Sequence, residues 1–224
     1  MKALLLSAVV VAAADICAAQ QTVFNVPTAD VLDRGKVYTE LDATAQPTPG
    51  DGTFTPRVVI GLGNKIEVGV NGSSFSAPDA STFSFVPTLK WKFAEAKGFA
   101  AFAGIEAFFP VYKRGYDAGA YTYVAVAKSM HNTRVTIGAY DFTAHVVDRG
   151  NRAGIQAAVE QTLNSRWTAA ADWYSGNQAS GFFTPGVIMK ASKAVTLYGG
   201  YEIGNANLSQ GNHAFLFEIG WNLN

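Results

Sequence analysis

The stretch Phe215-Leu216-Phe217-Glu218-Ile219-Gly220-Trp221-Asn222-Leu223 decides the fold class of this chain. From Phe217 onward, large apolar side chains alternate with polar or small ones. Successive side chains of a β-strand point to opposite faces, so this segment has one apolar face and one polar face. The pattern therefore predicts an amphipathic β-strand.

The same period of two continues along most of the chain. It predicts twelve strands, at residues 36–46, 54–63, 66–76, 83–94, 98–109, 119–130, 133–146, 153–163, 166–175, 182–191, 194–204 and 213–223. Short connections alternate between them with longer ones rich in Gly, Pro, Asp and Asn. Short periplasmic turns and longer outer loops give a membrane barrel this pattern, with both termini on the periplasmic side.

Composition agrees with a membrane barrel. Charged residues make up 15% of the 224 residues and hydrophobic residues 49%, whereas about 25% of a typical soluble domain is charged. After the N-terminal run, no stretch reaches the length of a membrane-spanning helix. Every backbone polar group must be paired inside lipid, which leaves a closed barrel. We expect an all-β, transmembrane, antiparallel up-and-down β-barrel of about twelve strands over residues 36–224.

The N-terminus has the pattern of a signal peptide. Lys2 precedes the apolar run Ala3–Ala14, which is too short to anchor the chain as a spanning helix, and Cys17-Ala18-Ala19 offers small residues before a cut. We expect residues 1–19 to be removed, and with them the only cysteine, so that no disulfide remains. Residues 20–35 either plug the barrel or lie in the periplasm, and the sequence does not choose between these.

The polar parity of the strands predicts which side chains line the lumen. Polar inside and apolar outside is the membrane arrangement, because a soluble barrel normally has an apolar interior. The predicted lumen-lining residues are Glu40, Asp42, Arg57, Glu67, Lys90, Lys92, Glu106, Arg134, Glu160, Asp172, Lys190, Glu202 and Glu218.

Aromatic side chains near the strand ends predict a girdle at the two water–lipid interfaces. These residues are Trp91, Phe99, Trp167, Trp173, Phe183, Tyr201 and Trp221.

Two strands leave the register open. Asp141 falls on the lipid face if strand 133–146 is regular, and a bulge near Gly138 would return it to the interior. Strand 119–130 permits either parity.

The lumen supports two interpretations that the sequence does not separate. One is a narrow polar channel, with an acidic wall of Glu40, Asp42, Glu202 and Glu218 that favours cations or polar solutes. The other is a network of ion pairs that fills the lumen of a structural or surface-interaction barrel. Twelve strands lie between filled eight-stranded barrels and open sixteen-stranded porins. The expected width of the lumen therefore does not decide between the two interpretations.

Catalysis is the least favoured class of function. None of His131, His145 and His213 is followed two residues later by a serine, as in an outer-membrane phospholipase, and a His-based nucleophilic site needs a hydroxyl or thiol within reach. No metal or cofactor motif is found, and the net charge of zero gives no reason to expect nucleic acid. We expect no enzyme activity, no catalytic residues, no metal and no cofactor.

Two motifs carry a family resemblance. The segment from Phe24 to Leu32, followed by Arg34-Gly35-Lys36 and Glu40-Leu41-Asp42, resembles the opening of small outer-membrane proteins grouped with the phenol-degradation MetA-pathway family and related putative transporters. The last strand resembles the closing strand that the barrel assembly machinery reads, although it ends on Asn224 instead of an aromatic residue. The resemblance implies passage of small molecules and transfers no site residues.

Together these features predict a protein secreted to the periplasm and inserted in the outer membrane of a Gram-negative bacterium. The expected function is a porin-like channel or transporter for passive passage of small polar solutes. Its expected partners are the lipid bilayer, the barrel assembly machinery and a small solute.

Overall fold

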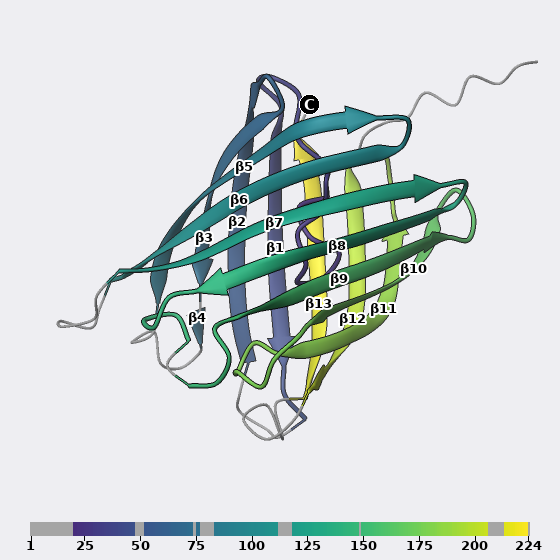
Figure 1. Ribbon diagram of the computed structural model, residues 1–224. Helices are drawn as coiled ribbons and strands as arrows, with labels where there is room; N and C mark the ends of the chain where they lie inside the picture. Colours follow the sequence, from purple (N-terminus) through teal and green to yellow (C-terminus); the bar gives the residue numbers. More distant parts are fainter. Residues whose placement is uncertain are drawn as a thin grey trace, which may run out of the picture.

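The chain forms a closed antiparallel barrel in the computed structural model (Figure 1). The structure describes residues 20–47, 52–73, 75–76, 83–111, 118–147, 149–205 and 213–223. The predicted signal peptide lies outside these residues, as do most of the predicted outer loops. Among the residues that the structure describes, no helix is long and apolar enough to span a membrane.

Twelve long strands and one short extension make the sheet. The strands are β1 (Val37–Ala45), β2 (Gly52–Gly63), β3 (Ile66–Ser73), β4 (Phe75–Ser76), β5 (Ser84–Ala96), β6 (Phe99–Pro110), β7 (Gly119–Met130), β8 (Thr133–Phe142), β9 (Ala153–Thr162), β10 (Trp167–Tyr174), β11 (Phe182–Lys190), β12 (Val195–Gly204) and β13 (Ala214–Leu223). The two-residue β4 pairs with β2 beyond the end of β3. The prediction of twelve antiparallel strands is confirmed.

Strand β1 closes the barrel. It pairs with β2 on one side and with β13 on the other, both antiparallel and without a register shift. All other long strands pair with their neighbours in the sequence. Closure gives each long strand two partners, so no long strand of the described residues leaves an edge of unpaired backbone groups.

The eighth strand ends earlier than the sequence predicts. The predicted strand 133–146 stops at Phe142, because the carbonyl of Thr143 accepts the amides of Val146 and Val147, both at 3.1 Å, and closes a turn. The chain therefore turns at the rim of the barrel.

The two uncertain registers are now fixed. Strand β8 pairs regularly with β7 and β9 through Gly138, so the bulge considered there is absent and Asp141 is exposed on the outer face. Strand β7 turns Tyr121 and Tyr123 inward and exposes Val124 and Val126.

An apolar belt covers the outside of the barrel. Exposed large apolar side chains come from strands around the whole barrel, for example Leu41, Val58, Ile60, Leu89, Ile105, Ile137, Ile155, Val159, Val187, Phe215 and Phe217. The opposite parity contains buried carboxylates and a buried lysine, namely Glu40, Glu67, Lys90, Glu160, Asp172, Glu202 and Glu218. A soluble protein would bury the first set and expose the second.

Glycines in the wall make room for interior aromatic rings. A methyl group added at Gly220 would overlap the ring of Tyr38, and one added at Gly104 would overlap the ring of Tyr123. These glycines let large side chains lie flat against the inner wall.

The belt gives a test of which surface faces lipid. Ile137→Arg should lower the free energy of unfolding in phospholipid vesicles by about 2–4 kcal/mol, because Ile137 lies in the middle of β8, where the bilayer is driest. Leu163→Arg is the matched control: Leu163 is 61% exposed at a tight turn, where an arginine costs about 0–1 kcal/mol. Equal losses for both variants, measured by denaturant unfolding, would contradict the predicted depth of the belt.

Candidate functional site

Residues 20–34, here called the inner segment, run inside the barrel (Figure 1). Four of their side chains, Val23, Phe24, Val26 and Thr28, are at most 2% exposed. The segment makes a tight hairpin, in which the Val23 amide donates to the carbonyl of Val26 over 2.9 Å. The described residues that contact this segment belong to the strands of the barrel. Its buried side chains therefore lie within the lumen.

Asp172 of β10 holds the tip of the hairpin. Its Oδ2 accepts hydrogen bonds from the backbone amides of Phe24, Asn25 and Val26, at 3.0, 2.5 and 2.7 Å. Three amides that converge on one carboxylate oxygen form an anion-binding concavity. Hydrogen bonds to a charged acceptor are roughly twice as strong as neutral ones.

Side chains of the tip fit the wall on β11 and β12. The amide nitrogen of Asn25 donates to Oγ1 of Thr184 at 3.1 Å and to Oε1 of Glu202 at 3.2 Å. The ring of Phe24 lies against Gly186, which faces Gly200 across the strand pair. A Cβ at Gly186 would come within 2.5 Å of that ring, so these two glycines form its pocket.

Basic side chains of the wall reach the ends of the inner segment. Nη1 of Arg134 donates to both carboxylate oxygens of Asp30 at 2.8 Å, while its Nε lies 2.5 Å from Glu160. Nζ of Lys90 donates to Oε1 of Gln21 at 3.2 Å. Wall and segment are thus joined by charged groups on β5 and β8.

Glu67 of β3 serves both the wall and the inner segment. Its Oε1 lies 2.9 Å from Nζ of Lys90, and its Oε2 accepts the backbone amide of Leu32 at 2.9 Å. The segment then leaves the lumen at a close approach to β2, where the Gly35 amide donates to the carbonyl of Gly61 at 2.8 Å.

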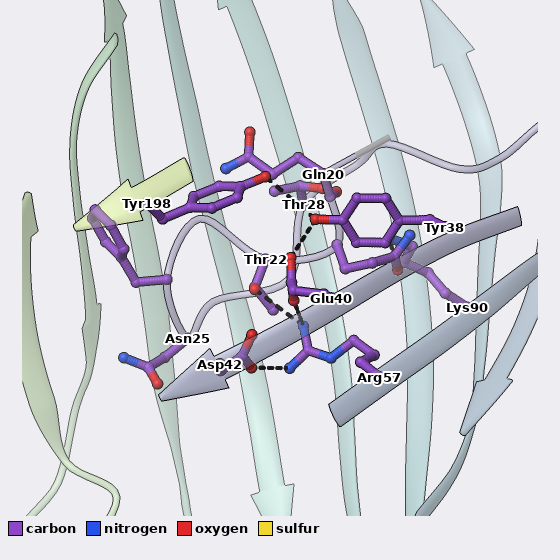
Figure 2. Close-up of polar contacts among 12 residues, drawn as sticks. Gln20, Thr22, Asn25, Thr28, Tyr38, Glu40, Asp42, Arg57, Lys90 and Tyr198 are labelled. Carbon is purple, nitrogen blue, oxygen red and sulfur yellow. Dashed lines mark hydrogen bonds and ion pairs between the residues drawn. The ribbon is translucent and has the colours of Figure 1, made fainter. Parts of the chain in front are cut away.

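A cluster on β1 and β2 contacts the segment at Thr22 (Figure 2). Arg57 donates to Glu40 at 2.7 Å, to Asp42 at 3.1 Å and to Oγ1 of Thr22 at 3.3 Å. The hydroxyl of Tyr38 donates to the other oxygen of Glu40. Glu40 is therefore held from both sides.

The predicted lumen residues fall into three groups. Nine of them bind the inner segment or each other, as described above: Glu40, Asp42, Arg57, Glu67, Lys90, Arg134, Glu160, Asp172 and Glu202. Glu106 shares a small cavity with Arg57, and Glu218 is buried opposite Asp42 on β13. Lys92 instead pairs with Glu95 at the end of β5, at 2.8 Å, and Lys190 is exposed at the mouth of the barrel.

The predicted girdle residues differ in exposure. Trp91, Phe99, Trp167, Trp173 and Phe183 are exposed on the outer surface, whereas Tyr201 and Trp221 are partly covered. Tyr201 packs edge-on against Phe215 with ring centres 4.9 Å apart, which explains its lower exposure.

The structure also contains an interior aromatic cluster that the sequence did not predict. Tyr121, Tyr140, Phe142 and Tyr174 pack together inside β7, β8 and β10, and the hydroxyl of Tyr121 donates to Gln156 at 2.6 Å. The signal was present as alternate aromatic residues in strand 119–130, but their parity was ambiguous. One side of the lumen is therefore aromatic and not simply polar.

The space in the barrel is divided by the inner segment. A polar vestibule of about 530 Å³ opens near the tight turns and is lined by Gln20, Asp30, His131, Arg134, Glu160 and Lys190. Beside the segment, a cavity of about 30 Å³ lies between Gln21, Arg57, Glu67, Lys90 and Glu106. The second cavity has room for about one water molecule, so the space beside the inner segment is far smaller than the vestibule.

Hydrogen exchange can test whether Asp172 holds the tip of the hairpin through its three hydrogen bonds. Asp172→Asn should cost the tip about 1–3 kcal/mol and speed exchange of the Phe24, Asn25 and Val26 amides at least about fivefold, because a neutral acceptor replaces a charged one. Asp141→Asn, on the outer face, should leave these amides unchanged. Equal protection in wild type and Asp172→Asn would show that this carboxylate does not hold the tip.

Comparison with known proteins identifies the fold. The sequence matches no protein-family model and no curated protein. Among solved structures, a KdgM porin has a TM-score of 0.62 at 9% identity over 84% of this chain and 99% of its own. A NanC porin gives 0.60 at 10% over 83% and 99%, and an outer-membrane channel from Pseudomonas putida F1 gives 0.53 at 11% over 86% and 97%. The chain therefore has the fold of these porin-like barrels.

Proposed function

We propose that this protein is an outer-membrane channel for passive passage of small polar solutes, and that the inner segment closes it. One observation carries the proposal: the middle of the barrel is filled by residues 20–34, which are not part of its wall. The similar solved structures are porins and an outer-membrane channel, which supports a solute-conducting role.

Most contacts of the inner segment can be exchanged for water. They are hydrogen bonds and ion pairs, and each contributes only about 0.5–1.5 kcal/mol net, or up to 3 kcal/mol with a charged partner. The vestibule of about 530 Å³ already brings solvent to Asp30 and Arg134. Val23, Phe24, Val26 and Ala29 make the apolar contacts that opening would disrupt.

The interior charge suggests the class of solute. One of the similar structures is a KdgM porin in complex with disordered oligogalacturonate, which is a polyanion. Here carboxylates outnumber basic groups among the interior side chains, and Glu40, Asp42 and Glu218 lie on two adjacent strands. We therefore propose neutral or cationic small solutes.

The same proposal covers the cellular context. It places the apolar belt in the bilayer of a Gram-negative outer membrane, after removal of residues 1–19 and insertion by the barrel assembly machinery. Membership of the MetA-pathway-like group remains part of the proposal and rests on the motifs at Phe24–Leu32 and Glu40–Asp42. No catalytic activity is assigned.

A second candidate is a structural or surface-interaction barrel with a permanently filled lumen. It is favoured by the contacts of Arg57, Lys90 and Arg134, each of which bridges the wall and the inner segment. In this case the segment would be a fixed part of the core.

Conductance measured before and after the inner segment is crosslinked to the wall separates the channel from the filled barrel. Cys17 is replaced by alanine, and Asn25→Cys with Thr184→Cys places two thiols where the side chains now lie 3.1 Å apart. A short thiol crosslinker should fix the tip to β11 and abolish channel openings in planar bilayers. The same protein without crosslinker should conduct.

Either single-cysteine variant, treated with the same reagent, is the control and should still conduct. A well-folded protein that stays silent with and without the crosslinker would favour the filled barrel. Equal conductance in both states would mean that solutes do not pass the inner segment.

A further inference from the structure

Three carboxylates meet on the strands that close the barrel. Glu40 and Asp42 belong to β1, and Glu218 lies directly opposite Asp42 on β13. One oxygen from each of the three lies within 4.8 Å of the others. The first and last strands thus bring acids from the two ends of the sequence to one point.

Glu218 has no hydrogen-bond partner among the described residues. It is 3% exposed, and both its carboxylate oxygens are buried without a donor. Oδ1 of Asp42 is buried without a donor as well. An ionised group removed from water without compensation costs several kcal/mol, so such oxygens indicate a missing positive partner.

Arg57 supplies only part of the positive charge. Its guanidinium binds Glu40 and Asp42 at 2.7 and 3.1 Å but makes no ion pair with Glu218. Three carboxylates and one guanidinium leave two negative charges, which equals the charge of one divalent cation. The uncompensated oxygens lie on the side of the cluster formed by Asp42 and Glu218.

We propose that Glu40, Asp42 and Glu218 bind a divalent cation of the calcium class. Ca²⁺ takes carboxylate oxygens at about 2.3–2.6 Å, so two oxygens on one ion lie at most about 5 Å apart, which fits the cluster. Mg²⁺ needs near-ideal octahedral geometry at about 2.0–2.1 Å and should bind more weakly. The all-oxygen donor set disfavours thiophilic metals.

This site differs from the sequence expectation of no metal. Asp42 and Glu218 are far apart in the sequence, and only the closure of the barrel makes them cross-strand neighbours. The proposal does not depend on solute passage, since a filled structural barrel would have the same cluster.

Calcium binding to the purified, folded full chain in detergent tests the proposal. After removal of divalent ions, titration calorimetry with CaCl₂ alone should give one saturable site, with a dissociation constant of about 10⁻⁵ to 10⁻³ M. Glu218→Gln and Asp42→Asn should each weaken binding at least about tenfold, because each loses a charged ligand. MgCl₂ should bind more weakly than CaCl₂.

Glu202→Gln is the matched control, because Glu202 is also an interior glutamate and lies outside the cluster. It should keep wild-type affinity for Ca²⁺. Thermal unfolding provides a second measurement: Ca²⁺ should raise the melting temperature of wild type, whereas Glu218→Gln should gain no stability from Ca²⁺ and be at least as stable as metal-free wild type.

Three results would overturn the proposal. They are no saturable binding by folded wild type, undiminished binding by both cluster variants, or an equal loss in Glu202→Gln. If one cluster variant does not fold, the other decides the result.

Discussion

Backbone hydrogen bonds that pair around a closed sheet determine how the wall and the interior of this barrel are arranged. Strand β1 bonds to both β2 and β13, so each long strand has two partners. Alternate side chains of each strand point to opposite faces, and closure makes one face the outer surface and the other the lumen wall. The apolar belt and the charged interior are two consequences of that single constraint.

The charged groups inside the barrel need hydrogen-bond partners or water. Buried carboxylates at Asp172, Glu67 and Glu160 need donors, and two of them receive backbone amides of the inner segment. The segment in turn exposes backbone groups that need acceptors. Wall and segment therefore satisfy each other's hydrogen bonds, which explains why a stretch without regular secondary structure is ordered inside a barrel.

Much of the fold was accessible from the sequence because the period of two is a local property. Strand number, the alternation of short and long connections, and the inward parity of Glu218 all follow from neighbouring residues. Asp141 and Tyr121 were ambiguous because a charged residue on the outer face and aromatic residues on the inner face reverse the usual pattern. The contacts of Asp172 with Phe24, Asn25 and Val26 depend on residues far apart in the chain, so no local pattern predicts them.

We propose a solute path that runs through the barrel and is closed by residues 20–34. Uptake of a small neutral polar solute into liposomes that contain the folded protein tests it most directly. We expect uptake above that of protein-free liposomes, limited by solute size, and faster when the inner segment is loosened by Asp172→Asn. Uptake equal to that of protein-free liposomes, for both wild type and this variant, would contradict it.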